Sequence, residues 1–291
     1  MTPTALTIAG SDSGGGAGVQ ADLKAFARCG VHGACAITAI TAQNTTGVQA
    51  IHEVPAEIVL AQVRAVLSDI SVHAVKVGML GTEAVTLAVA QALDELPAGT
   101  PVVVDPVMVA ESGAALLHPD AQRALIREIL PRASVLTPNL PEALALAGGE
   151  RSPRDAHDQQ AEPLGRVERH ARDADDEQAE QLAVALLELG PSAVVLTGGH
   201  RARAADVYVD RAGQRRAVHI GGERHPDGAA HGSGCTHSSL LAAQLALGRT
   251  PLQAARVARA LAGEAVARGL RDVGAGAGPV DVIGLQRERT A

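Results

Sequence analysis

The chain has 291 residues, of which 46% are hydrophobic and 20% are charged, and its formal net charge is −7. This length suits one large α/β domain, and a negative charge without a basic cluster argues against nucleic-acid binding. Because aromatic residues make up only 1%, the core must consist of alanine, valine, leucine and isoleucine. That mix is typical of parallel strands that are covered by helices on both faces.

The cysteines and the N-terminus indicate where the chain works. Cys29, Cys35 and Cys235 have no CxxC spacing, which predicts neither a disulfide framework nor a zinc site and fits a reducing compartment. No basic segment and apolar run precede the first strand, so no secretory signal is expected. No stretch approaches about 18 uninterrupted apolar residues, which predicts no membrane span. We therefore expect a cytoplasmic protein with a small-molecule partner.

Apolar runs alternate with segments of helical periodicity along the chain. The predicted strands cover residues 5–9, 33–41, 73–77, 102–108, 134–137 and 193–200, a hairpin joins 205–210 to 215–220, and the predicted helices cover 19–28, 59–67, 85–96, 119–130, 182–189, 232–247 and 250–269. This order predicts an open α/β/α sheet. A ligand site is expected where the carboxyl ends of its strands meet.

The first strand runs into a glycine-rich loop at residues 10–18. Glycines let a ligand approach the backbone closely, but the loop matches neither GxGxxG nor the Gly-Lys-Ser/Thr of a P-loop. Asp12 and Asp22 add polar groups that a passive turn does not require. We therefore favour a ligand loop over a plain connection.

Polar residues also follow or interrupt the next strands. Gln43 and Asn44 offer donor and acceptor groups suited to the edge of a heterocycle. The alternative is a turn that Asn44 stabilises and Gly47 closes. Lys76 lies within an apolar strand, so it requires a carboxylate or a ligand as a partner if it is buried.

Two further carboxylates lie at predicted strand ends or helix starts. Asp105 follows an apolar strand, where its carboxylate suits magnesium or a bound water, or simply caps the next turn. Asn139 and Glu142 are three residues apart at a helix start, so both side chains can face one point. The same spacing fits an ordinary capping box.

Residues 151–178 interrupt the alternation. Charged and polar residues dominate this segment, and Leu164 and Val167 are its only large aliphatic side chains. Because such a segment cannot bury much apolar surface, a mobile surface insertion is predicted. A solvated loop is favoured over a flexible lid.

The sequence His-Gly-Ser-Gly-Cys-Thr at residues 231–236 precedes a run rich in alanine and leucine. Gly232, Ser233 and Gly234 therefore fall on the first turn of a helix, where free N–H groups and the helix dipole favour a phosphate or an oxyanion. Cys235 would feel the same field, and its pKa is expected to be lowered if solvent reaches the thiol. The alternative is a turn into a core helix with Cys235 as a small buried residue.

Eight blocks of sequence together resemble, in order, the motifs of the hydroxymethylpyrimidine/phosphomethylpyrimidine kinase family of thiamine biosynthesis. The resemblance covers nearly the whole chain apart from residues 151–178. The blocks are Gly10-Ser11-Asp12, residues 15–24, residues 41–45, residues 76–80, residues 105–108, residues 137–142, Gly198-Gly199-His200 and residues 231–236.

The resemblance implies a three-layer α/β/α ribokinase-like fold with a mostly parallel central sheet, in one kinase domain over residues 1–291. It implies ATP-dependent phosphorylation of 4-amino-5-hydroxymethyl-2-methylpyrimidine and then of its monophosphate. ATP and Mg²⁺ are the expected cofactors, and a homodimer is the assembly that the family suggests. The residue matches place Gln43, Gly10, Ala17 and Met79 at the pyrimidine, Asn139 and Glu142 at the magnesium and phosphates, and Cys235 with Gly232, Ser233 and Gly234 at the reacting group.

The polar groups at the other strand ends complete the expected site. We expect Asp22 to bind substrate and Asp105 to join Glu142 at the metal. The expected nucleotide-binding residues include Thr197, Gly199 and Lys76. The family carries lysine where Glu111 and Thr197 stand, so the chain has fewer positive charges near the expected phosphates.

The chemistry follows from these roles as a hypothesis. A Cys235 thiolate accepts the hydroxymethyl proton while N–H groups of residues 232–235 hold the moving phosphoryl group. Two other functions stay open: a pyridoxal or pyridoxine kinase of vitamin B6 salvage, and a pyrimidine-binding regulator without catalysis. A nicotinamide dehydrogenase is disfavoured because the glycine-rich loop lacks the dinucleotide fingerprint.

Overall fold

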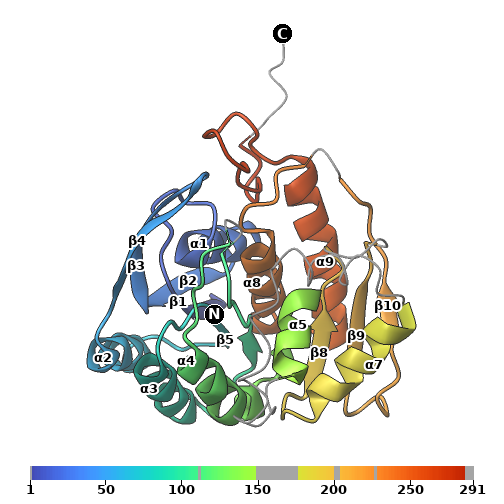
Figure 1. Ribbon diagram of the computed structural model, residues 1–291. Coiled ribbons are helices and arrows are strands. Elements are labelled where there is room, and N and C mark those ends of the chain that lie inside the picture. The colour runs from blue at the N-terminus through green and yellow to red at the C-terminus, as the bar shows by residue number, and fades with distance from the viewer. Residues whose placement is uncertain (1, 111–112, 149–175, 200–203, 226–227, 286–291) are drawn as a thin grey trace, which may run out of the picture.

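A computed structural model describes residues 2–110, 113–148, 176–199, 204–225 and 228–285 (Figure 1). Its main sheet has the strand order β10-β9-β8-β7-β6-β5-β1-β2. These strands are β1 (Thr4–Ala9), β2 (His32–Ile37), β5 (Ala74–Val77), β6 (Val102–Val104), β7 (Val135–Leu136), β8 (Ala193–Leu196), β9 (Asp206–Asp210) and β10 (Val218–Ile220).

Within this sheet, neighbouring strands pair in parallel in the order β2, β1, β5, β6, β7 and β8. Strands β9 and β10 add antiparallel pairs at one edge. Strand β1 has β2 on one side and β5 on the other, so the direction in which successive strands are added reverses at β1. Ligands of open α/β sheets bind outside the carboxyl ends of the strands at such a reversal. The mostly parallel α/β sheet is confirmed, and the rule for such sheets points to the region next to β1 and β5 as the place for the expected site.

Helices cover both faces of the sheet (Figure 1). One core cluster joins the sheet to α2 (Ala56–Leu67), α3 (Glu83–Asp94), the π-helical turn that follows α4 (Pro119–Ala124), α5 (Leu140–Ala147) and α7 (Asp176–Leu187). The other joins it to α1 (Gly18–Arg28), α8 (Ser233–Ala246) and α9 (Pro251–Ala267). Both clusters are almost entirely aliphatic, as the composition required. In the described part of the chain, no helix is both long and apolar enough to cross a membrane.

The predicted strand over 33–41 is wrong in its second half. Strand β2 ends at Ile37, and β3 (Ala39–Asn44) pairs instead with β4 (Gly47–Glu53) in a separate antiparallel hairpin. Thr38 fixes the point of departure, because its N–H donates to Ala9 O and its hydroxyl donates to Met79 O at 2.6 Å. The chain therefore leaves the sheet beside the ends of β1 and β5, and the hairpin stands over the site.

Other boundaries differ by smaller amounts. Strand β6 stops at Val104, before the predicted end at 108. The predicted helix over 119–130 is α4 followed by a π-helical turn at Leu125–Ile129 and a 3₁₀ turn at Leu130–Arg132, because Pro131 cannot continue an α-helix. The predicted insertion lies outside the described residues except at 176–178, where α7 already begins.

Candidate active site

The N-terminus of α8 lies where two glycine segments meet. Gly232 has a φ of 78°, and a Cβ added to it would lie 1.7 Å from the carbonyl oxygen of Gly16. Only glycine fits both conditions. The first α-helical hydrogen bond runs from Thr236 N–H to Gly232 O, while Ser233 N–H already donates to Ala230 O. The predicted anion site therefore has the expected helix start, but the Ser233 amide is already occupied.

Asp12 organises the glycine-rich loop. Its carboxylate accepts hydrogen bonds from the backbone N–H groups of Gly14 at 2.8 Å, Gly16 at 3.0 Å and Ala17 at 2.8 Å, and it lies 2.9 Å from Nε2 of His231. Burial alone raises the pKa of Asp12, but the hydrogen bonds from His231, Ala17 and Gly14 outweigh it and lower the pKa below its ordinary value. The carboxylate therefore stays charged and holds the loop in one conformation.

The hairpin brings Gln43 to this loop. Ser13 Oγ donates to Gln43 O at 2.6 Å and accepts from Gln43 N–H at 2.8 Å. The register of the hairpin shifts between Ala42 and Gln43, and such a bulge re-aims a side chain. Gln43 lines a cavity of about 360 Å³ together with the turn at 44–47, His231, Gly276 and Ala277.

Asn44 serves the turn. Its side-chain oxygen accepts from both the N–H and the hydroxyl of Thr46, at 2.9 and 2.7 Å, and Gly47 follows with a φ of 153°. The interpretation of Asn44 as a turn-forming residue is confirmed. Of the two polar residues after the second strand, Gln43 therefore has the position suited to a ligand.

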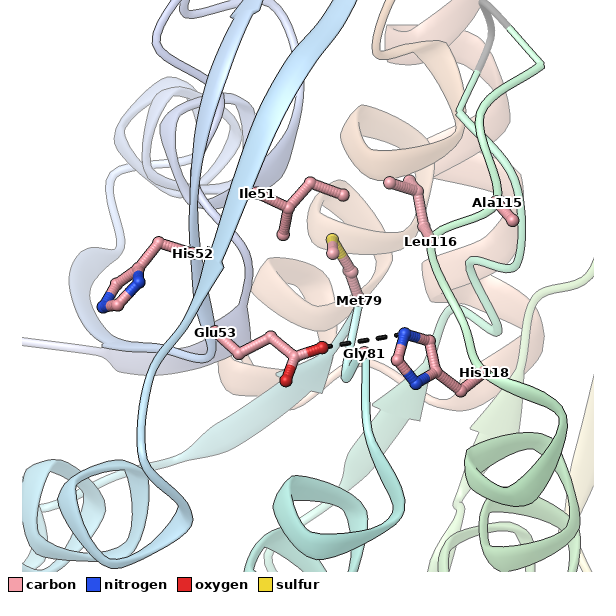
Figure 2. A pocket seen from close by; sticks show the side chains of 8 residues that line it. All are labelled: Ile51, His52, Glu53, Met79, Gly81, Ala115, Leu116 and His118. Atoms are coloured by element: carbon pink, nitrogen blue, oxygen red, sulfur yellow. Dashed lines mark ion pairs between the residues drawn. The ribbon is translucent and has the colours of Figure 1, made fainter.

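A second cavity of about 520 Å³ lies against β4 of the hairpin. Figure 2 shows Ile51, Met79 and Leu116 pointing into it, while Glu53 reaches toward His118, 3.7 Å away. Met79 also contacts the glycine-rich loop, since a Cβ on Gly10 would lie 2.9 Å from its sulfur. Of the predicted pyrimidine residues, Met79 thus lines this cavity, Gln43 lines the first one, and Gly10 lies against the Met79 sulfur.

Asp22 and Lys76 lie beneath the site and have no exposed side-chain surface. Lys76 Nζ is 3.0 Å from Asp22, whose oxygens also accept from Thr7 and Ser239, each at 2.6 Å. Burial alone lowers the pKa of Lys76, but the nearby carboxylates raise it above its ordinary value. The expected direct contacts of Asp22 with substrate and of Lys76 with nucleotide do not fit this geometry, because the two charges neutralise each other out of reach of a ligand.

A lowered pKa was expected for Cys235 only if solvent reaches its thiol, and the structure does not meet that condition. Burial raises the pKa of its thiol to about 12, and the charges of Asp105 and Asp22 add to this effect. The Lys76 ammonium and the Gly18 N–H act in the opposite direction but do not outweigh it. Burial of the thiol in the half-buried Cys235 thus outweighs the helix start. Cys235 is a neutral thiol, placed between the N-termini of α1 and α8.

Asp105 and Glu142 form the acidic side of the site. Ser238 Oγ donates to Asp105 at 2.9 Å, and Lys76 Nζ lies 3.8 Å away, yet burial keeps the pKa of Asp105 above its ordinary value. Burial and the charge of Asp105 raise the pKa of Glu142 to about 8. Such mutual repulsion is the setting in which a divalent cation stabilises two carboxylates.

Asn139 and Glu142 form the capping box that their spacing allowed. Glu142 N–H donates to the Asn139 side chain and Asn139 N–H donates to the Glu142 carboxylate, each at 2.9 Å. Within the described residues no cluster of three or more histidine, cysteine, aspartate or glutamate side chains could hold a metal. A magnesium ion here would thus need water or phosphate oxygens as its other ligands, as is usual for this ion.

The predicted nucleotide residues Thr197 and Gly199 lie at the carboxyl end of β8. Thr197 N–H donates to Pro138 O at 2.9 Å, which joins this strand end to the start of α5. Asp206 accepts from Gly198 N–H at 2.9 Å and pairs with His237 of α8 at 3.0 Å, while Gly199 is exposed. Glu111 lies outside the described residues.

Sequence reasoning missed the polar groups that connect these parts. Nothing in the local pattern indicated that His231 bonds to Asp12, that Ser238 bonds to Asp105 or that Ser239 bonds to Asp22. The two serines are three and four residues after Cys235, on the face of α8 that meets the sheet. Helical spacing from Cys235 was the one available signal.

Comparison with known proteins found a matching family model and similar relatives. A family model described as phosphomethylpyrimidine kinase matches residues 12–281. A relative from Rhizobium meliloti, named hydroxymethylpyrimidine/phosphomethylpyrimidine kinase, is 44% identical over 96% of this chain and 97% of its own length. The similarity therefore extends over nearly the full length of both chains.

Two solved structures show the same fold. A phosphomethylpyrimidine kinase from Clostridium difficile is 34% identical and has a TM-score of 0.67 over 88% of this chain and 96% of its own. The pyridoxal kinase from Staphylococcus aureus, in complex with AMP-PCP and pyridoxal, is 30% identical and has a TM-score of 0.80 over 99% of this chain and 96% of its own.

Proposed function

This chain belongs to the phosphomethylpyrimidine kinase family and is an ATP-dependent kinase of thiamine biosynthesis, and we propose that it works at the junction of α1, α8 and the hairpin. Its activity is the phosphorylation of the hydroxymethylpyrimidine and then of the monophosphate. The observation that carries the assignment is the match over nearly the whole length to relatives with this activity. The proposals below concern the residues and the metal.

The helix start and the acidic side suit opposite charges. Phosphoryl transfer depends mainly on positioning and on neutralising charge, rather than on covalent help from the protein. The amides of Gly234 and Cys235 would face the transferred phosphoryl group. Asp105 and Glu142 would hold Mg²⁺, which supplies charge neutralisation at the phosphates when bound. The raised pKa of both carboxyl groups supports this fit, because a cation would offset the burial and the carboxylate repulsion that raise it.

The pyrimidine would lie between the glycine-rich loop and the hairpin. Gln43 would read the edge of the ring, and Gly10, Ala17 and Met79 would form its apolar surroundings. Thr197 and Gly199 would lie along the nucleotide, at the carboxyl end of β8. Asp22 and Lys76 support the floor of the site from below, consistent with their complete burial.

The neutral state of Cys235 changes the expected mechanism. A thiol with a pKa of about 12 carries very little thiolate at neutral pH, so we propose that Cys235 positions the hydroxymethyl group and does not act as its base. A general base contributes roughly 100- to 10,000-fold. We therefore expect Cys235→Ala to lower kcat by less than about 100-fold. A larger loss, together with a wild-type kcat that rises tenfold per pH unit from pH 7 to 10, would support a Cys235 thiolate as the general base.

The assembly and location are proposals that rest on the family resemblance. We propose a homodimer in the cytoplasm, with residues 1–291 as one kinase domain. Light scattering coupled to size exclusion tests the dimer directly. A mass of about 29.6 kDa, the mass of one chain, would contradict it.

A direct assay tests the function. ADP release is measured with ATP and Mg²⁺ while the hydroxymethylpyrimidine, its monophosphate and pyridoxal are offered separately, and the products are resolved by mass. Turnover of both pyrimidines is the expected result. Pyridoxal is included because the pyridoxal kinase structure has the higher TM-score of the two structural neighbours. Turnover of pyridoxal alone would move the assignment to vitamin B6 salvage, and binding without turnover would indicate a regulator.

A further inference from the structure

A hydrogen bond between two side chains joins two segments that are far apart in sequence. Nε2 of His231 lies 2.9 Å from Asp12, and 219 residues separate the two. Asp12 has 1% of its surface exposed and His231 has 8%. The bond therefore lies in the interior, between the loop that follows β1 and the residue immediately before the left-handed Gly232.

The two segments are in contact on both sides of this bond. A Cβ on Gly16 would lie 2.2 Å from the His231 ring, and a Cβ on Gly232 would lie 1.7 Å from Gly16 O. His231 also pairs with the C-terminal segment, since its N–H donates to Gly278 O at 3.3 Å and its carbonyl accepts from Val280 N–H at 3.1 Å. The backbone of His231 is thus fixed by these two hydrogen bonds, and its imidazole in turn positions the Asp12 carboxylate.

The Asp12 carboxylate passes this position on to the loop. Its oxygens accept from the amides of Gly14, Gly16 and Ala17, which are the residues immediately before α1 begins at Gly18. A shift of the carboxylate would therefore move the start of α1. Gly18 N–H in turn points at the Cys235 thiol, whose pKa it lowers.

We propose that the Asp12–His231 pair is a positioning pair, which sets the distance between the loop that binds the pyrimidine and the α8 N-terminus that binds the phosphoryl group. The pair touches neither reacting atom and acts through Gly16, Ala17 and Gly232. This role rests on the proposed function, because both substrates must meet at this junction. A misplacement of about 1 Å in such a junction can cost about 100-fold in rate.

Three substitutions of His231 test the pair. Gln places an amide N–H near the position of Nε2, whereas Asn places it near Nδ1, too far from Asp12, and Ala removes the donor. His219→Ala is the matched control, because His219 also pairs with a carboxylate, Glu180, at 2.6 Å, but lies at the edge of the sheet on β10. Steady-state kcat and both KM values are measured with the hydroxymethylpyrimidine and ATP.

We expect His231→Ala and His231→Asn to lower kcat by about 10- to 100-fold, since the reacting groups lose alignment. Both KM values should change by less than about threefold, because each substrate keeps its own contacts. His231→Gln should stay within about fivefold of the wild type, and His219→Ala should not change kcat. Equal losses for Gln and Asn, or no loss for Ala, would overturn the proposal.

Amide hydrogen exchange gives a readout that does not depend on turnover. Peptides that cover residues 12–18 should exchange faster in His231→Ala and His231→Asn than in the wild type and His231→Gln, while other peptides stay unchanged. Unchanged exchange at 12–18 in all variants would contradict the pair. If the wild type itself forms no phosphorylated pyrimidine, the proposed function fails, and the exchange result still decides whether His231 holds the loop.

Discussion

Three acidic side chains, Asp22, Asp105 and Glu142, lie at this site, and their surroundings are of two opposite kinds. Asp22 has a lysine at 3.0 Å and two hydroxyl donors. Asp105 shares the same lysine only at 3.8 Å and faces Glu142, so the pKa of Asp105 lies above its ordinary value and that of Glu142 is about 8. One carboxylate is neutralised by the protein, and the other two are left short of positive charge.

This difference separates structural charge from functional charge. A buried ion pair with complete hydrogen bonding needs nothing more, and its loss affects the fold first. A pair of carboxylates that repel each other costs stability in the free protein, and such a cost is typical of a site that binds a cation. The four predictions below test this division, from the largest expected effect to the smallest.

Removal of the lysine should affect stability most. Lys76→Met leaves Asp22 buried without its partner, and breaking a buried pair in this way costs about 3–5 kcal/mol. The free energy of unfolding in urea measures the loss. Arg64→Met is the control, because the Arg64–Glu95 pair is exposed to solvent and its loss is expected to change the free energy of unfolding little. Equal stability of both variants would contradict the structural role of the Asp22 pair.

Neutralising the acidic side should affect activity and leave the fold intact. Glu142→Gln keeps a capping box with Asn139 but removes the charge proposed to hold Mg²⁺. We expect kcat/KM to fall by about 100-fold or more at fixed Mg²⁺, since a metal stabilises transition-state charge by several kcal/mol. Without Mg²⁺, the Glu142→Gln variant should be at least as stable as the wild type. A variant with full activity would remove Glu142 from the metal site.

The pH dependence of metal affinity should follow Glu142. Its carboxyl group has a pKa of about 8 in the free protein, so it is mostly protonated below pH 8, and Mg²⁺ must displace that proton. The Mg²⁺ concentration for half-maximal rate should rise by up to about tenfold per pH unit below pH 8. Glu142→Gln should remove this slope. A wild-type half-saturation that is constant from pH 6 to 8 would contradict the assignment.

The free energy of unfolding of the Mg²⁺-free protein should also depend on the titration of Glu142, but more weakly. The pKa of Glu142 is raised from 4.5 to about 8 on folding, so the folded state binds more protons than the unfolded state between these values. Stability therefore falls as pH rises through this range, by at most about 1.4 kcal/mol per pH unit. Saturating Mg²⁺ should flatten the decline. Thermal unfolding with and without Mg²⁺, compared with Glu142→Gln, measures it.

Much of the fold was accessible from the sequence because its patterns are local. Aliphatic runs and helical spacing located all the strands of the main sheet, the closing hairpin at β9 and β10, and the helix that begins after Gly232. The hairpin of β3 and β4 was missed because an apolar strand before Thr38 and an alternating one after it read as one continuous segment. The turn at 44–47, with glycine at its end, was the signal for a second strand.

The site was accessible only in part, because its chemistry depends on burial and on distant partners. The pKa of Cys235 depends on burial and on Asp105 and Asp22, which the local helix start could not reveal. Lys76 was recognised as needing a partner, but its partner Asp22 lies 54 residues away. A sequence pattern identifies which residues gather at the strand ends. Which of these residues form buried ion pairs, as Lys76 and Asp22 do, follows only from the three-dimensional packing.

The pairing of Asp12 with His231 also sets an order of events during synthesis. Because 219 residues separate the partners, a ribosome that adds about 5–20 residues per second leaves the glycine-rich loop without its anchor for about 10–45 seconds. The strands from β1 to β10 can be synthesised in that time, but α8, whose N-terminus forms the proposed phosphoryl site, cannot. The nascent enzyme is therefore expected to have no catalytic site until its last quarter has left the ribosome, whatever has folded before.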